Sequence, residues 1–327
     1  LMATLPKDVD VAVFLADLHG EPVQDLEPLS GGYWSSAYGY RLGDNEQVLR
    51  LGDMREGFEM DRAAMAFRRE GLPIPDVLDI GDGPSGLTYA ISVRHHGRFI
   101  ESAAPDEAER VGPTLAALLA SLLAVPAAPD QPVEWFGGAG ATEPARGWRS
   151  WLLSGLVDDP ARRVSGWRAM LAAEPDIDRL FVACERRIDG LLDACPERRD
   201  LVHGDLYYGN VLIDEDAAKV TGVFSWKCSV RGDFLLDVAL STFWTPWHPG
   251  IGAADVWGRV TTAPAFTADE ALLVDAPLRH HCYELQIGAS HMGWNAWNGD
   301  HETQAKLVAH LSEVLERGPL EMPDSSR

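Results

Sequence analysis

The sequence predicts an α+β protein of two lobes, with a small sheet-rich lobe over residues 1–97 and a larger, mostly helical lobe over 98–327. Two observations predict this class. A chain of 327 residues is longer than one compact core of ordinary size. Alternating apolar residues and turn signals gather before Gly97, whereas helical periodicity dominates after it.

The N-terminal lobe is expected to be a small sheet with a helix inserted. Its elements follow in chain order: a helix over 8–18, a glycine- and serine-rich loop over 28–36, a strand ending near Tyr40, a returning strand over 47–51, a helix over 57–70, and strands over 76–80 and 87–93. The first two strands form a hairpin with small residues at one end, and Gly71 ends the second helix.

The C-terminal lobe is expected to be helical around one hairpin. Helical spacing covers 106–125, 146–157, 177–195 and 301–317. The strand signals are limited to 210–213 and 219–224, joined by an acidic turn over 214–216.

Composition limits the classes of ligand and the cellular compartment that we expect for this protein. The net charge of −22 disfavours nucleic acid and would attract a cationic ligand, although the same charge would serve solubility equally well. The four cysteines lack zinc-ligand spacing, which is typical of reduced thiols in a cytoplasmic protein. We expect no signal peptide and no membrane span, since no apolar stretch approaches the roughly 20 residues that a span needs. A monomer is expected.

One short loop carries the strongest chemical signal. His203-Gly204-Asp205 follows two apolar residues, and Asn210 lies five residues after Asp205, directly before a strand. A carboxylate here can hold an attacking hydroxyl and take its proton, while an amide oxygen nearby can bind a divalent cation beside phosphates. The alternative is an ordinary turn that uses Asp and Asn in their usual roles.

The stretch HGDLYYGNVLID resembles the catalytic loop of the aminoglycoside phosphotransferases. The segments 72–81, 195–203 and 243–247 are similar to the hygromycin B phosphotransferase branch, and the resemblance extends over about 25–317. It implies a bilobal protein-kinase-like fold and ATP-dependent phosphorylation of a hydroxyl on an antibiotic-like molecule, in resistance or natural-product biosynthesis.

The resemblance also implies roles for residues. Asp205 would be the catalytic base, with His203 beside it in the loop, and Asn210 a magnesium ligand. The nucleotide, ATP or GTP, would be bound by a phosphate loop, a charged pair and a hinge: Ser30, Gly31, Gly32, Ser35 and Ser36; Arg50 with Asp61 as its partner; and Ser92 to Arg94.

The chain departs from the family at one metal-binding position. The family has an aspartate there, and this chain has Ser225, with the register fixed by Trp226. A serine hydroxyl is a neutral and poorer magnesium ligand than a carboxylate. Lys227 adds a positive charge two residues on, which would supply part of the missing charge if it faces the cleft; the alternative is a surface lysine.

Three functions therefore stay open: a kinase whose metal is held by Asn210 and another acid such as Asp205 or Asp233, a binding protein without turnover, or an enzyme of the same fold with other chemistry. A cationic or sugar-like substrate would be contacted by residues of the second lobe, with these candidates: Asp233, Asp237, Glu284 and Trp244. The histidines around 280 and 281 are expected to be structural.

Overall fold

A computed structural model describes residues 9–30, 34–134 and 147–323. The chain divides into two compact units. The first combines Leu1–Ser102 with Asp205–Cys228, and the second combines Ala103–Gly204 with Ser229–Arg327. The predicted catalytic loop thus begins in the second unit and continues into the first, and the expected lobe limits at 97 and 98 stay a prediction.

The first unit is built on a five-stranded antiparallel sheet in the order β1-β2-β3-β5-β4. Its strands are β1 (Gln24–Leu29), β2 (Ser35–Leu42), β3 (Asn45–Gly52), β4 (Val77–Asp82) and β5 (Thr88–Val93). The hairpin of β2 and β3 pairs Ser35 with Gly52 and Leu42 with Asn45, so the predicted hairpin is confirmed.

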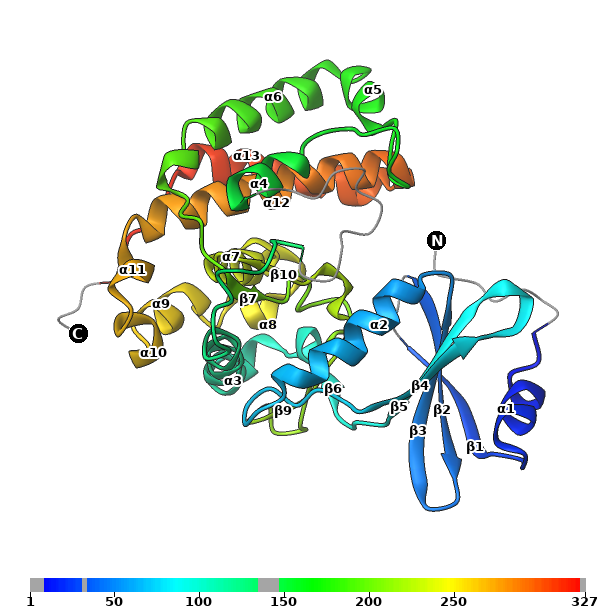
Figure 1. The fold of residues 1–327 in the computed structure, drawn as a ribbon. Coiled ribbons are helices and arrows are strands. Elements are labelled where there is room, and N and C mark those ends of the chain that lie inside the picture. The colour runs from blue at the N-terminus through cyan, green and yellow to red at the C-terminus, as the bar shows by residue number, and fades with distance from the viewer. Residues whose placement is uncertain (1–8, 31–33, 135–146, 324–327) are drawn as a thin grey trace. The chain divides into compact units, whose positions relative to one another are not determined.

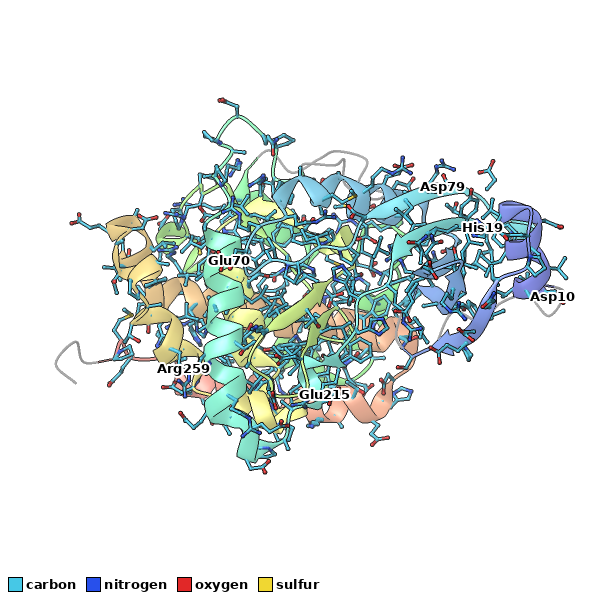
Figure 2. All side chains as sticks on the ribbon, turned by 90° about the horizontal axis from the view of Figure 1, so that it is seen from below. Asp10, His19, Glu70, Asp79, Glu215 and Arg259 are labelled. Atoms are coloured by element: carbon cyan, nitrogen blue, oxygen red, sulfur yellow. The ribbon has the colours of Figure 1, made fainter. Side chains whose placement is uncertain are left out.

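Two helices cover opposite faces of this sheet (Figure 1). Helix α1 (Val11–His19) begins at Asp10, whose carboxylate caps two backbone amides, and His19 in its last turn bonds the Tyr40 hydroxyl at 3.0 Å (Figure 2). Its Leu15 packs against Leu49 and other apolar residues of one sheet face. Helix α2 (Arg55–Ala64) places Phe58 against the other face. Strand alternation thereby separates Leu49 from Arg50.

A second, three-stranded sheet completes the first unit in the order β6-β8-β9. Its strands are β6 (Arg98–Phe99), β8 (Val211–Ile213) and β9 (Val220–Val223). The last two confirm the predicted hairpin after the catalytic loop. Short 3₁₀ turns lie at η1 (Met65–Phe67), η2 (Pro84–Gly86), η3 (Ile100–Ser102) and η6 (Trp226–Cys228).

The second unit is helical, with one short pair of strands, β7 (Asp200–Val202) and β10 (Val230–Gly232). Its helices are α3 (Ala108–Leu123), α4 (Trp148–Ser154), α5 (Trp167–Ala172), α6 (Pro175–Asp189), α7 (Leu235–Phe243), α8 (Pro249–Gly252), α9 (Val256–Thr261), α10 (Pro264–Thr267), α11 (Glu270–Leu273), α12 (Ala276–Asn298) and α13 (His301–Arg317), with 3₁₀ turns η4 (Pro105–Glu107), η5 (Leu192–Ala194) and η7 (Thr245–Trp247). Helix α12 packs against α5, α6, α7 and α13, and most of its residues are buried (Figure 1).

The α+β class with a sheet-rich and a helical part is confirmed. The helix predicted over 57–70 ends earlier, at Ala64 and the η1 turn, because Arg69 and Leu72 bond to each other through their backbones and reverse the chain. Strand β1 and the short helices between α7 and α12 had no clear signal in the sequence. Across the described residues, no helix has the length and hydropathy to cross a bilayer.

Candidate active site

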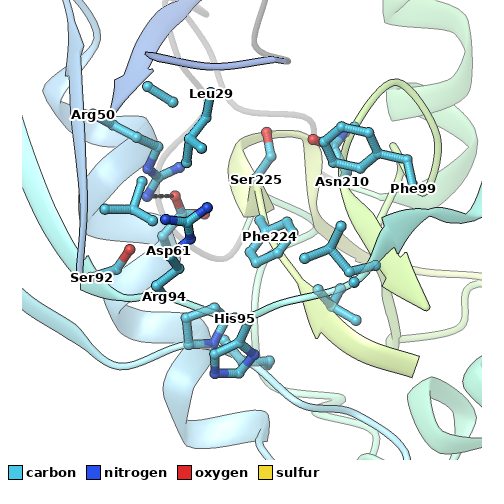
Figure 3. Close-up of a pocket in the computed structure, with 18 of the residues that line it drawn as sticks. Leu29, Arg50, Asp61, Ser92, Arg94, His95, Phe99, Asn210, Phe224 and Ser225 are labelled. Atoms are coloured by element: carbon cyan, nitrogen blue, oxygen red, sulfur yellow. Dashed lines mark ion pairs between the residues drawn. The ribbon is translucent and has the colours of Figure 1, made fainter. Parts of the chain in front are cut away.

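A cavity of about 500 Å³ lies in the first unit and gathers most of the predicted nucleotide-binding residues (Figure 3). One wall is the α2-facing side of the large sheet, and the opposite wall is the small sheet with residues 223–226. Apolar side chains from both walls line it: Leu29, Val48, Ile74, Val77, Leu212 and Phe224. The size and the mixture of apolar walls with a few polar groups are typical of a small-molecule site.

Arg50 and Asp61 form an ion pair in this cavity (Figure 3). Arg50 points there because Leu49 and Leu51, its neighbours on β3, face α1. Its Nη2 lies 2.5 Å from Asp61 Oδ2, and the other carboxylate oxygen accepts a 2.7 Å hydrogen bond from the Trp226 amide. Asp61 is therefore the partner of Arg50, as predicted, and it also fixes the segment that contains Ser225.

The predicted phosphate loop is described in part. Ser30 and Ser35 line the cavity. Ser36 follows Ser35 on β2, so strand alternation points it to the other face of the sheet. Gly31 and Gly32 lie outside the described residues. Phosphate binding by this loop stays a prediction.

The predicted hinge, Ser92 to Arg94, lines the cavity, but two of its amides already have backbone partners. Val93 N–H donates to Asp76 O at 2.9 Å, and Arg94 N–H donates to Glu46 O at 3.0 Å. The side chain of Arg94 reaches Glu27 at 2.8 Å and lies over Gly39, where a Cβ would stand 2.7 Å from Arg94 Nη1. Gly39 thus makes room for a guanidinium at the cavity wall.

The cavity wall continues through His95, His96 and Gly97, which sequence reasoning did not select. His95 Nδ1 lies 2.7 Å from Thr221 O of the small sheet. Gly97 has φ +145°, and a Cβ there would stand 2.3 Å from Ile213 O. Only glycine permits this close approach, which joins the end of β5 to the small sheet.

Asp205 and Asn210 are brought together as the spacing predicts. The side-chain Nδ2 of Asn210 donates to the backbone carbonyl of Asp205 at 2.8 Å, and Asn210 lines the cavity. Burial raises the pKa of the Asp205 carboxyl to about 6, while Lys227 and the hydrogen bond from Asn210 act in the opposite direction. The pKa of Asp205 therefore lies well above that of an ordinary aspartate, and the group is mostly ionised at neutral pH.

Glu101 is a second acid at the catalytic loop, and no motif in the sequence indicates it. Its Oε1 accepts a 2.5 Å hydrogen bond from the Gly209 amide, which holds the catalytic loop one residue before Asn210. Burial raises the pKa of its carboxyl, and its charge contributes to the raised pKa of Asp205.

Ser225 lines the cavity together with Asn210 (Figure 3). Its φ of +62° places it in the left-handed region, where Asp and Asn are more readily accommodated than most side chains. The magnesium that the resemblance implies would meet two neutral ligands here. Within the described ranges, no group of three His, Cys, Asp or Glu side chains could hold a metal ion. Because magnesium in such sites is normally anchored by carboxylates, these residues do not fit the family's metal site.

His203 and Asp237 belong to the second unit, and both are fully buried. The amides of His203 and Gly204 donate to the two oxygens of Asp237 at 2.7 and 2.9 Å. Asp237 therefore supports the start of the catalytic loop. Its predicted contact with substrate stays a prediction, which this burial disfavours.

Asp233 is also fully buried, in a network with Arg279 and Tyr283. Two Arg279 nitrogens lie 2.6 and 2.8 Å from its oxygens, and the Tyr283 hydroxyl donates at 2.6 Å. Metal or substrate binding by Asp233 likewise stays a prediction that its partners disfavour.

Glu284 and Trp244, the other predicted substrate residues, are buried in the second unit. Glu284, Arg317 and Thr242 line a cavity of about 350 Å³. The Arg317 guanidinium donates to the Glu284 carboxylate at 2.5 Å. Burial raises the pKa of the Glu284 carboxyl to about 7, against the effect of Arg317. Trp244 packs edge-on against Phe243, Trp247 and His291.

The sheet with its Arg50–Asp61 pair, the loop that joins Asp205 to Asn210 and the helical second unit define a kinase-like fold. Residues 25–263 match the family described as "Phosphotransferase enzyme family" (APH), and the chain belongs to this family.

Known relatives specify the branch. The hygromycin-B 4-O-kinase of Escherichia coli is 31% identical over 231 residues, which cover 69% of this chain and 64% of that relative's length. A thermostable mutant of the aminoglycoside phosphotransferase APH(4)-Ia, solved with AMP-PNP and hygromycin B, superposes with a TM-score of 0.76 at 27% identity, over 94% of this chain and 98% of the other. Another mutant of it, with ADP and hygromycin B, gives 0.78 at 26% identity, over 95% and 99%. The resemblance to the hygromycin B branch is confirmed.

Proposed function

We propose that this chain is a nucleotide-dependent phosphotransferase that acts on a hydroxyl of an aminoglycoside-like molecule related to hygromycin B. The observation that carries the proposal is Asp205, a carboxylate with a pKa of about 6 in the catalytic loop of a phosphotransferase-family chain. A general base works best when its pKa lies near the operating pH, and Asp205 meets this condition.

The nucleotide would bind in the first unit's cavity. Its apolar walls suit a purine ring, and Arg50 supplies a positive charge for the phosphates. Since the amides of Val93 and Arg94 have backbone partners, a backbone N–H donated to the base falls to the residues that follow, His95 to Gly97. The AMP-PNP and ADP complexes of the similar enzyme support nucleotide use. ATP is the first candidate and GTP the second.

The transfer itself needs few protein groups. Asp205 accepts the proton of the acceptor hydroxyl, whose oxygen attacks the γ-phosphorus. The bond between this phosphorus and the bridging oxygen breaks, and the nucleoside diphosphate leaves with that oxygen. Arg50 faces the charge on the remaining phosphates, and Asn210 holds the backbone of Asp205 in place.

The acceptor is proposed to be cationic. The net charge of −22 would attract an aminoglycoside. Of the predicted substrate acids, Glu284 is the one that lines a cavity in the described part of the second unit, and Asp255 and Glu313 line it as well. To bind an amine, Glu284 would have to exchange its ion pair with Arg317 for the substrate.

The test is direct phosphorylation of hygromycin B. Purified protein is incubated with the antibiotic and ATP or GTP, and the phosphorylated product is measured by mass spectrometry. We expect Asp205→Asn to lose at least about 100-fold in kcat because it removes the base. Asp216→Asn, in an exposed turn of the same unit, is the matched control and should keep its activity. Nucleotide binding without transfer to any aminocyclitol would instead favour a binding protein.

A further inference from the structure

Lys227 follows directly after Ser225 and Trp226, which line the nucleotide cavity. It belongs to η6, two residues after Ser225, and its Nζ is 4.4 Å from the centre of the Trp34 ring. Trp34 directly precedes β2 and follows the segment predicted to cover the phosphates. The ammonium therefore contacts Trp34, and the next residue, Ser35, is the first residue of β2 and lines the cavity.

The same ammonium acts on Asp205. Its positive charge is the main influence that lowers the pKa of this carboxyl against the effect of burial. Lys227 is thus held within electrostatic reach of the base on one side and against Trp34 on the other. The ammonium of Lys227 is therefore close enough to act on the carboxylate that the proposed transfer uses as its base.

The backbone next to Lys227 is held in place by a neighbouring helix. The Trp226 amide is bound by Asp61, so η6 is tied to α2. A Cβ on Gly57 of α2 would lie 3.5 Å from Lys227 Cβ, so the start of the Lys227 side chain runs along this helix. The hydrogen bond between Asp61 and the Trp226 amide and the packing against Gly57 therefore fix the position from which the Lys227 side chain extends.

The charge of Lys227 also bears on the metal site. Ser225 and Asn210 are neutral, and the charge of Lys227 already acts on Asp205, the carboxylate that the Asn210 side chain contacts. Lysine is a common phosphate ligand, acting as a compact point charge with three donors. Ser225, which replaces the family's carboxylate, is thus followed two residues later by the positively charged Lys227.

We propose that Lys227 supplies the positive charge on the terminal phosphates of the nucleotide, so that this chain binds its nucleotide without depending on magnesium. The inference rests on the proposed nucleotide use and deepens it. It requires no metal ligand at position 225, which is consistent with serine there.

The experiment measures binding of ATP by calorimetry in EDTA and in magnesium, using the full chain. We expect the wild type to bind ATP with similar Kd values, within about threefold, in both buffers. Lys227→Met keeps the length of the side chain and removes its charge, and should weaken ATP binding in EDTA by about tenfold or more. Lys227→Arg should recover most of this loss. AMP, which lacks the terminal phosphates, should bind both proteins equally.

Two further variants sharpen the result. Lys219→Met removes an exposed lysine directly before β9 in the same unit and should leave binding unchanged. The double variant Ser225→Asp with Lys227→Met restores a carboxylate, which the backbone at φ +62° accommodates, and should bind ATP more tightly in magnesium than in EDTA.

The proposal is overturned if the wild type loses ATP binding in EDTA, or if Lys227→Met binds as the wild type does without magnesium. Should Lys227→Met fail to fold, the wild-type comparison and Lys227→Arg still decide the question. ATP binding in EDTA without phosphate transfer to hygromycin B would defeat the proposed function and leave this inference standing. If the protein phosphorylates hygromycin B but binds its nucleotide only in magnesium, the proposed function stands and this inference is overturned.

Discussion

Asp205 has to be ionised to accept a proton, and its surroundings set the pH at which this happens. Burial favours the neutral acid and raises its pKa to about 6, with a smaller contribution from Glu101. Lys227 and the hydrogen bond from Asn210 favour the carboxylate and limit the rise. At neutral pH the group is therefore mostly ionised but still close to its midpoint.

We therefore expect kcat/KM for phosphate transfer to fall as the pH drops through about 6, since protonated Asp205 cannot act as a base. Lys227→Met should move this midpoint upward, because the lost positive charge had stabilised the carboxylate. The measurement is a profile of kcat/KM between about pH 5 and 8, with Lys219→Met as the control. A midpoint that moves downward in Lys227→Met would contradict this account.

At the scale of the element, Asp61 connects three pieces of the first unit. It sits on α2, pairs with Arg50 on β3 and binds the amide of Trp226 in η6. The helix is thereby tied to the sheet that lines the cavity and to the segment that carries Ser225. A single buried carboxylate, 5% exposed as a residue, sets the relative positions of these elements.

Asp61→Asn should lower the free energy of unfolding by about 2–3 kcal/mol, because it leaves a largely buried guanidinium without its counter-charge. Nucleotide affinity should fall with it. Glu59→Gln, on the same helix, removes an acid from partly exposed ion pairs with Arg55 and Arg62 and should cost about 0.5 kcal/mol or less. Urea unfolding of both variants gives the comparison, and equal losses would show that the Asp61 network adds nothing.

At the scale of the whole molecule, the second unit buries many ionisable groups. Burial lowers the pKa of five of its histidines, to about 3 for His280 and about 4 for His281, and in the same direction for His248, His291 and His310. The unfolded chain therefore binds more protons at these sites as the pH falls below 6.5. Glu284 and Glu185, whose pKa values are raised by burial, act in the opposite direction but are fewer.

The protein should accordingly lose thermal stability between about pH 7 and pH 5, because the five histidines outweigh the four acids whose pKa values burial raises: Glu185 and Glu284 in the second unit, and Glu101 and Asp205 in the first. His281→Leu should make this dependence shallower, since both ring nitrogens of His281 are buried without a hydrogen-bond partner among the described residues. His96→Gln, at an exposed site in the first unit, should leave it unchanged. Thermal unfolding followed by circular dichroism at several pH values tests this, and a Tm that rises toward pH 5 would contradict it.

Local patterns explain what could be predicted. Alternation and turn residues are short-range properties, so the β2–β3 and β8–β9 hairpins were found from the sequence alone. The Arg50–Asp61 pair was also found, through the resemblance to a family. Glu101 and Gly97 had no such signal, and neither had the contact of Arg94 with Glu27, because each depends on a partner that is distant in the chain.

Residue identity alone accounts for much of the chemistry available to this protein. The spacing of Asp205 and Asn210, and a serine at the family's metal position, are matters of residue identity and count. Only the tertiary structure decided which charged groups face a cavity. It buried Asp233 and Asp237 against partners of their own, and it brought Lys227 against Trp34. Such contacts join residues far apart in the chain, so packing rather than local pattern selects them.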